Sequence, residues 1–130
     1  MRKSYLQECQ RWYNDRLHLG HQCTDAKAFA YSWHEENEPA QCKIGYCSTE
    51  PFAYLWGNKF PHQKRLPVIF LTIGASSSTA AKSIEALLHK HFEAHHMVRS
   101  CAREWFEADK EAVCEAAKAL IQQLEREGAL

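Results

Sequence analysis

The sequence predicts an α+β (mixed α/β) domain: a ββαβα core with a three-stranded, mainly antiparallel sheet flanked by helices, plus N- and C-terminal helices. Residues 68–73 (V-I-F-L-T-I) form an apolar, partly β-branched run that is too short for a helix and is typical of a buried strand. Two aromatic or apolar stretches, 28–34 and 41–46, are separated by E-E-N-E-P, which favours a hairpin. Amphipathic spacing indicates a helix at each end of the chain.

Local signals place the remaining elements. Gly20 is expected to end the first helix, since glycine is common just past a helix C-terminus. Ser48 or Thr49 is expected to cap the second helix and Asp109 the last one. The expected helices cover 2–19, 49–57, 80–97 and 109–127, with a short extended piece at 104–106. We therefore expect a single domain, 1–130, with the N-terminal helix in 1–20, the core in 28–108 and the C-terminal helix in 109–127.

The charge balance limits the function classes. Sixteen Lys and Arg residues against sixteen Asp and Glu residues give a formal net charge of zero. Neutralisation of phosphates supplies most non-specific affinity for nucleic acid, so a strong autonomous binder usually carries a basic excess. Any contact with DNA is therefore expected to come from a local patch or from a partner.

Six cysteines raise the question of redox compartment. No apolar stretch reaches the about 20 residues that span a bilayer, and the N-terminus has no signal-peptide core. We therefore expect a cytoplasmic protein with reduced thiols and no membrane contact. A zinc site built from cysteines and histidines is a weaker alternative, because Cys42 and Cys47 lack a second paired cluster at suitable spacing.

Five short motifs occur in a characteristic order along the core. They are F-A-Y at 29–31, K-I-G at 43–45, S-T-E-P at 48–51, E-A-L-L-H at 85–89 and R-E-W-F at 103–106. This order resembles the GIY-YIG nuclease superfamily, and more closely its phage and mobile-element branch, whose second motif reads K-I-G. The last two motifs carry most of the specificity of this resemblance.

The resemblance implies a metal-dependent phosphodiesterase site. Glu85 matches the metal-binding glutamate, and Mg²⁺ or Mn²⁺ is the implied cofactor, if the domain is active. Tyr31, Lys43 and His89 match positions expected to act in catalysis, and Tyr54 stands where the family has its catalytic arginine. A phenol carries no positive charge with which to hold a phosphate.

Each of these residues also has an ordinary structural explanation. A strand tyrosine such as Tyr31 often packs its ring and exposes its hydroxyl, and Lys43 fits the solvent face of a strand. Glu85 and His89 share a helix face that could simply be solvated. His91 and His95, which would share a face of the same long helix, are a further metal-binding possibility.

Contacts to DNA are expected from basic residues near the core. Lys64 and Arg65, in the loop before the third strand, and Arg103, beside the closing strand, are the candidates.

Two functions remain open at this stage. The first is a GIY-YIG-type, divalent-metal-dependent DNA endonuclease-like domain with weakened or lost cleavage, acting in phage, mobile-element or DNA-processing biology. The second is a catalytically degenerate binding or regulatory module that acts through a protein partner at the terminal helices.

Overall fold

The structure is a computed structural model, and it describes residues 3–55, 67–99 and 102–129. Four α-helices, one 3₁₀ helix and six strands are formed by these residues. Their order is α1 (Lys3–Arg16), β1 (Leu19–Gln22), β2 (Ala28–Glu35), β3 (Cys42–Cys47), α2 (Pro51–Tyr54), β4 (Pro67–Ala75), α3 (Ser78–His91), η2 (Glu93–His95), β5 (His96–Arg99), β6 (Ala102–Phe106) and α4 (Lys110–Arg126).

The strands form one mixed sheet in the order β1-β4-β2-β3-β6-β5. The predicted strands β2, β3 and β4 are confirmed as its centre, and their mutual pairing is antiparallel. The sheet is larger than the predicted three strands. The edge strand β1 adds to β4 in parallel, and β6 and β5 extend the sheet beyond β3. These added strands are four or five residues long, which leaves little pattern to detect in the sequence.

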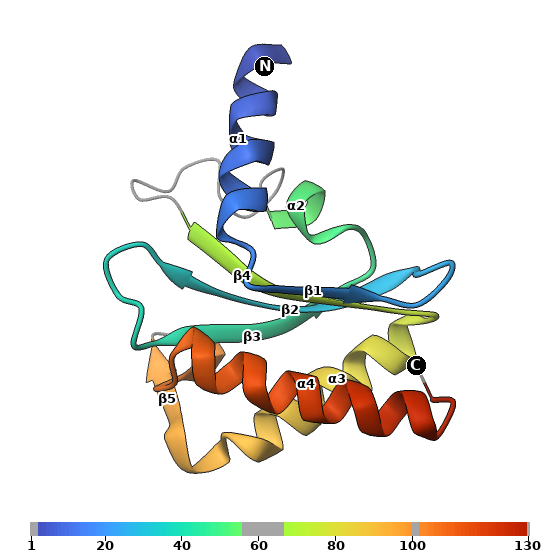
Figure 1. The fold of residues 1–130 in the computed structure, drawn as a ribbon. Coiled ribbons are helices and arrows are strands. Elements are labelled where there is room, and N and C mark those ends of the chain that lie inside the picture. Colours follow the sequence, from blue (N-terminus) through green and yellow to red (C-terminus); the bar gives the residue numbers. More distant parts are fainter. Residues whose placement is uncertain (1–2, 56–66, 100–101, 130) are drawn as a thin grey trace.

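Helices cover both faces of the sheet (Figure 1). Helices α1 and α2 lie on one face, and α3 and α4 lie on the other. Side chains alternate along a strand, so Phe29, Tyr31 and Trp33 of β2 face α1 and α2, whereas Ala28 and Ala30 face α3 and α4. This double cover explains why β2 is buried from its first residue to its seventh.

The helix expected over 80–97 is shorter than predicted. Helix α3 ends at His91, and Phe92 follows with non-helical backbone angles. Residues His96–Arg99 instead form β5, in which His96 pairs with Phe106. Pairing with β6 thus overrides the helical pattern of the sequence. The expected shared helix face of His91 and His95 is therefore wrong.

The other helix ends differ by small amounts. Helix α1 ends at Arg16, three residues early, because Leu19 and Gly20 join β1 beside β4. Helix α4 begins after Asp109, whose Oδ1 accepts a hydrogen bond from the amide of Ala112 at 2.9 Å, which confirms the predicted cap. In the described part of the chain, no helix combines the length and apolar character needed to cross a membrane.

Candidate active site

Tyr31 and Gly45 form the centre of the candidate site. They are direct partners in the β2–β3 register, so they lie on the same face of the sheet. A Cβ placed on Gly45 would lie 2.8 Å from the Tyr31 hydroxyl oxygen and 2.9 Å from its Cζ. The phenol ring therefore crosses over β3 at the one position of the K-I-G triplet that has no side chain. The glycine of this motif has a steric function that its sequence alone did not reveal.

The site lies at the point where β3 separates from β6. These two strands pair at Cys42 and Lys43. At the next residue, Ile44, the carbonyl oxygen accepts a hydrogen bond from Nε2 of His89 at 2.7 Å. His89 thus ties helix α3 to this stretch of β3. Because Nε2 is engaged with the backbone, only Nδ1 of His89 could reach another group.

Lys43 is held at both its backbone and its head group. Its carbonyl oxygen accepts a hydrogen bond from the hydroxyl of the buried Ser32 at 2.8 Å. Its Nζ lies 3.4 Å from Oε2 of Glu104, and the lysine side chain is only 20% exposed. Lys43 is therefore not a lysine on the solvent face of a strand, which was the alternative explanation. Lys43 is an ion-paired cation on the interior strand β3.

Glu85 comes from helix α3, which covers the face of the sheet opposite to the one that Tyr31 faces. It is still close enough for its charge to raise the pKa of Tyr31 and for Lys43 to lower the pKa of Glu85. Its Oε2 is buried and has no hydrogen-bond partner among the described residues. Desolvation raises the pKa of this carboxyl group, with a further increase from Glu104, whereas the charges of His89, Lys82 and Lys43 oppose the shift. A carboxylate with an unsatisfied buried oxygen is costly unless something binds it. The donor chemistry of Glu85 fits a hard divalent cation such as Mg²⁺, which takes oxygen ligands and needs few from the protein.

Tyr31 is 3% exposed, and its pKa is raised above the ordinary tyrosine value. Burial is the main cause, and the charge of Glu104 and the neighbouring Tyr54, Cys47 and Glu85 raise it further. The phenol is therefore neutral at physiological pH and can donate a hydrogen bond. It is not poised to act as a base.

Tyr54 occupies the last turn of the short helix α2, which approaches the same face as Tyr31. Glu50 caps this helix by accepting hydrogen bonds from the amides of Phe52 and Ala53 at 3.1 and 3.0 Å. Tyr54 is partly buried and packs against the apolar cluster that contains Tyr31. The position matched to the family arginine thus lies beside Tyr31 and holds a phenol in place of a guanidinium group.

Tyr31 lies within electrostatic reach of Tyr54 and Glu85, and Glu85 lies within electrostatic reach of Lys43. Lys64 and Arg65 lie outside the described residues. The backbone of Arg103 belongs to β6, but its side chain is outside the described part.

Glu104 was missed as a functional candidate in the sequence. It was noticed only as the first residue of the E-W-F triplet. Its contact with Lys43 joins residues 61 positions apart, and no local pattern reports such a contact.

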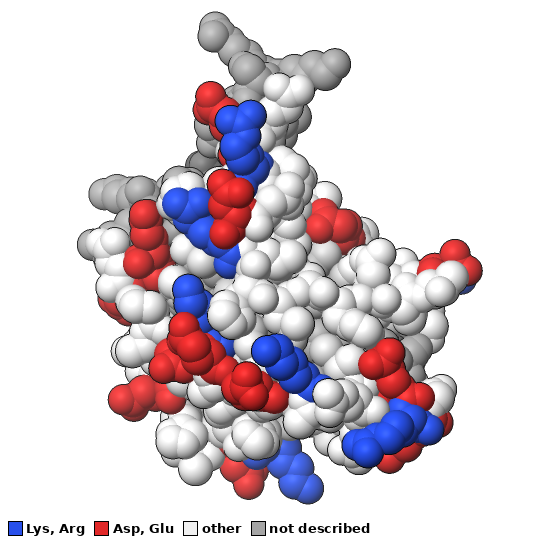
Figure 2. Space-filling model, viewed as in Figure 1, with Lys and Arg blue, Asp and Glu red and all other residues white. Residues whose placement is uncertain are grey.

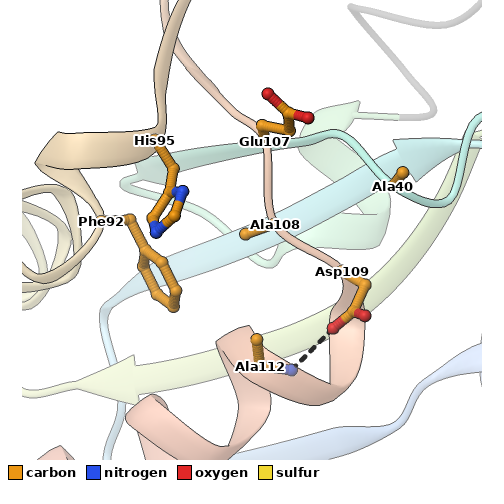
Figure 3. Close-up of a pocket in the computed structure, with 7 residues that line it drawn as sticks. All are labelled: Ala40, Phe92, His95, Glu107, Ala108, Asp109 and Ala112. Atoms are coloured by element: carbon orange, nitrogen blue, oxygen red, sulfur yellow. Dashed lines mark hydrogen bonds between the residues drawn. The ribbon is translucent and has the colours of Figure 1, made fainter.

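Two surface cavities lie away from Tyr31 and Glu85. The larger, of about 300 Å³, is shown in Figure 3, where the Asp109 carboxylate caps the first turn of α4 beside His95 and Phe92. Its lining residues are Ala40, Phe92, His95, Glu107, Ala108, Asp109 and Ala112. The second, of about 230 Å³, is lined by His89, Lys90, Glu93, His96 and Phe106. His89, which lies one helical turn from Glu85, is thus part of the lining of the second cavity.

The surface charges agree with the zero net charge. On the face shown in Figure 2, Lys and Arg side chains alternate with Asp and Glu side chains, and neither sign forms a broad patch. In the described ranges, no three His, Cys, Asp or Glu side chains are grouped so as to hold a metal ion. The five described cysteines are free thiols, and four of them are buried.

Comparison with known proteins identifies the family. A comparison with curated proteins gives no match, and a comparison with solved structures gives none either. Residues 28–121 match the T5orf172 domain. This match starts at the first residue of β2 and ends inside α4, so it includes the Tyr31, Lys43, Glu85 and Glu104 positions. The chain therefore belongs to the T5orf172 domain family, a phage-associated domain of the endonuclease-like type.

Proposed function

We propose that this chain is a GIY-YIG-type, divalent-metal-dependent DNA endonuclease-like domain with weakened cleavage, acting in phage, mobile-element or DNA-processing biology. One observation carries the proposal. The Tyr31 phenol crosses over Gly45 of β3. The Glu85 carboxylate, whose charge raises the pKa of that phenol, keeps a buried oxygen without a partner among the described residues. The GIY motif is expected to supply a hydrogen-bond donor, here the Tyr31 hydroxyl. The E-x-x-L-H motif is expected to supply a carboxylate that binds a metal ion, here Glu85.

Glu85 is the residue that would hold Mg²⁺ or Mn²⁺. When bound, such an ion would offset negative charge on a phosphate group of DNA. The preference of Mg²⁺ for a single carboxylate with several waters agrees with the lack of a larger acidic cluster in the described residues. His89 supports this assignment indirectly, because its bond to the Ile44 carbonyl fixes the turn of α3 that carries Glu85.

Tyr31 and Lys43 would act on the water and the phosphate. The neutral phenol of Tyr31 can donate a hydrogen bond to an attacking water or to a phosphate oxygen, and its burial restricts its orientation. Lys43 provides a cation on β3, although Glu104 neutralises it. Tyr54 offers no charge at the position of the family arginine. Loss of one contact to transition-state charge typically slows a reaction about 10²–10³-fold, and we therefore propose slow cleavage.

A second candidate is a binding or regulatory module on the same fold. Tyr54 in place of the arginine favours it, as does the neutralised Lys43. In that case the domain would act through a protein partner at the terminal helices and would not cut DNA.

The two candidates are separated by a cleavage assay. Supercoiled plasmid and branched DNA are incubated with the protein in Mg²⁺ or Mn²⁺ and in EDTA. The proposal predicts slow, metal-dependent cleavage that Glu85→Ala abolishes. Glu93→Ala, which removes an exposed carboxylate from η2, is the matched control and should cleave like the wild type. Absence of cleavage by the wild type in every metal would favour the binding module.

A further inference from the structure

Glu104 is the carboxylate that acts on three groups of the candidate site, Lys43, Tyr31 and Glu85. Its Oε2 lies 3.4 Å from Nζ of Lys43. Its negative charge also contributes to the raised pKa of Tyr31 and of Glu85, after burial as the main cause in each. The charge of Glu104 therefore affects Tyr31, Glu85 and Lys43 together.

The location of Glu104 makes this pair accessible to a ligand. The Glu104 side chain is 39% exposed, whereas that of Lys43 is 20% exposed. The Lys43 side chain is thus mostly covered, whereas solvent can reach the Glu104 side chain that pairs with it.

Lys43 has little freedom to form a contact elsewhere. Its backbone is fixed by the Ser32 hydroxyl and by the register with Trp33 on β2 and Trp105 on β6. With the backbone fixed, only the side chain of Lys43 can rearrange, and its ammonium group already contacts Glu104. An incoming anion would therefore have to compete with the Glu104 carboxylate for the same ammonium.

We infer that Glu104 sets the affinity of the site for a DNA phosphodiester, because it occupies Lys43 as an internal anion that the phosphate must displace. This inference rests on the proposed function for its ligand, DNA. The exchange replaces one ion pair by another, and no covalent bond changes. In the wild type, Lys43 therefore adds little to the affinity for DNA, because Glu104 already neutralises its charge.

Salt dependence distinguishes this role from a purely structural one. Each phosphate contact made by a cation contributes about −0.9 to the slope of log K against log salt concentration. Glu104→Gln releases Lys43 for such a contact. The variant should therefore bind duplex DNA about two- to fivefold more tightly at low salt, as expected for one partly exposed ion pair. Its salt slope should be steeper by about one contact.

The experiment measures fluorescence anisotropy of a labelled DNA duplex in EDTA, over a range of NaCl concentrations, so that cleavage plays no part. Glu107→Gln is the matched control, since it removes the same charge from an exposed residue three positions away. It should leave the slope unchanged. In the Lys43→Gln, Glu104→Gln double variant, the gain in affinity and the steeper slope should both disappear.

Three results would overturn the inference: no tightening by Glu104→Gln, an equal effect of Glu107→Gln, or a gain that survives in the double variant. Thermal unfolding of each variant confirms that it is folded. Failure of the proposed function looks different, because there Glu104→Gln tightens binding while neither it nor the wild type cuts DNA in Mn²⁺.

Discussion

The hydroxyl oxygen of Tyr31 lies 2.8 Å from the point that a Cβ on Gly45 would occupy. The two residues are opposite each other on β2 and β3, so neither can move away along the strand without a shift of register. The ring is also buried in the cluster that includes Phe29 and Trp33. A side chain at position 45 must therefore displace the phenol or the strand.

Gly45→Ala should destabilise the domain by about 1–3 kcal/mol, the usual cost of overpacking a core. Urea unfolding measures this change. Gly20→Ala is the matched control, because its Cβ would meet only the end of the flexible Leu17 side chain, at 2.9 Å. In a Tyr31→Ala background, Gly45→Ala should cost much less, since the ring that it meets is gone. Equal costs in both backgrounds would show that the ring is not the obstacle.

The stability of the fold should improve when the charge on Glu85 is removed. The pKa of this carboxyl is raised in the folded protein, mainly by desolvation. Such a carboxyl group does not lower the stability below its pKa in the unfolded state, because it is protonated in both states there. It destabilises the fold as the pH rises through its pKa in the folded state. Glu85→Gln should therefore be more stable than the wild type at pH 7, and the difference should shrink toward pH 3, as followed by thermal unfolding.

Metal binding should stabilise the wild type and leave Glu85→Gln unaffected. Mn²⁺ should raise the melting temperature of the wild type, because a ligand that binds only the folded state stabilises it. The same concentration should leave Glu85→Gln unchanged. A melting temperature that rises equally in both proteins would mean that the ion binds elsewhere.

Alkaline conditions should weaken the fold through buried thiols and a buried phenol. Burial raises the pKa of Cys42, Cys47 and Cys114 to about 11 and that of Tyr13 to about 12. Because the folded state retains these protons more strongly, their contribution is complete below about pH 9 and is lost as the pH rises through the folded pKa values.

The free energy of unfolding from urea titrations should accordingly fall steadily above about pH 9. Cys114→Ala should make this decline shallower. Cys23→Ala, at a partly exposed position, should leave its slope unchanged. A stability that stays flat up to pH 11 would contradict the account.

The centre of the fold could be predicted because its signals are local. The apolar run that became β4 and the Asp109 cap of α4 each act within a few residues. The end of α3 could not be predicted, because residues 92–97 carry a helical pattern that pairing with β6 overrides. The parallel edge strand β1 was missed for a similar reason: its four residues, L-G-H-Q, become a strand only beside β4.

The candidate site, too, could be predicted from the sequence only where its signals are local. Tyr31 and Glu85 were found because short motifs mark them. Glu104 was not, since its importance comes from its contact with Lys43, which brings β6 to β3. The steric function of Gly45 likewise depends on the register of two strands.

The most direct test of the nuclease-like site is to restore the missing charge. In Mn²⁺, Tyr54→Arg should raise the single-turnover rate of plasmid cleavage about 10²–10³-fold, if the arginine recovers one contact to transition-state charge. Tyr54→Lys is the control for charge alone and should recover less, because lysine lacks the planar fork that binds phosphate in a bidentate manner. Addition of Glu85→Ala should abolish cleavage by the Tyr54→Arg protein. Robust metal-dependent cleavage that survives Glu85→Ala would contradict the assignment of the site.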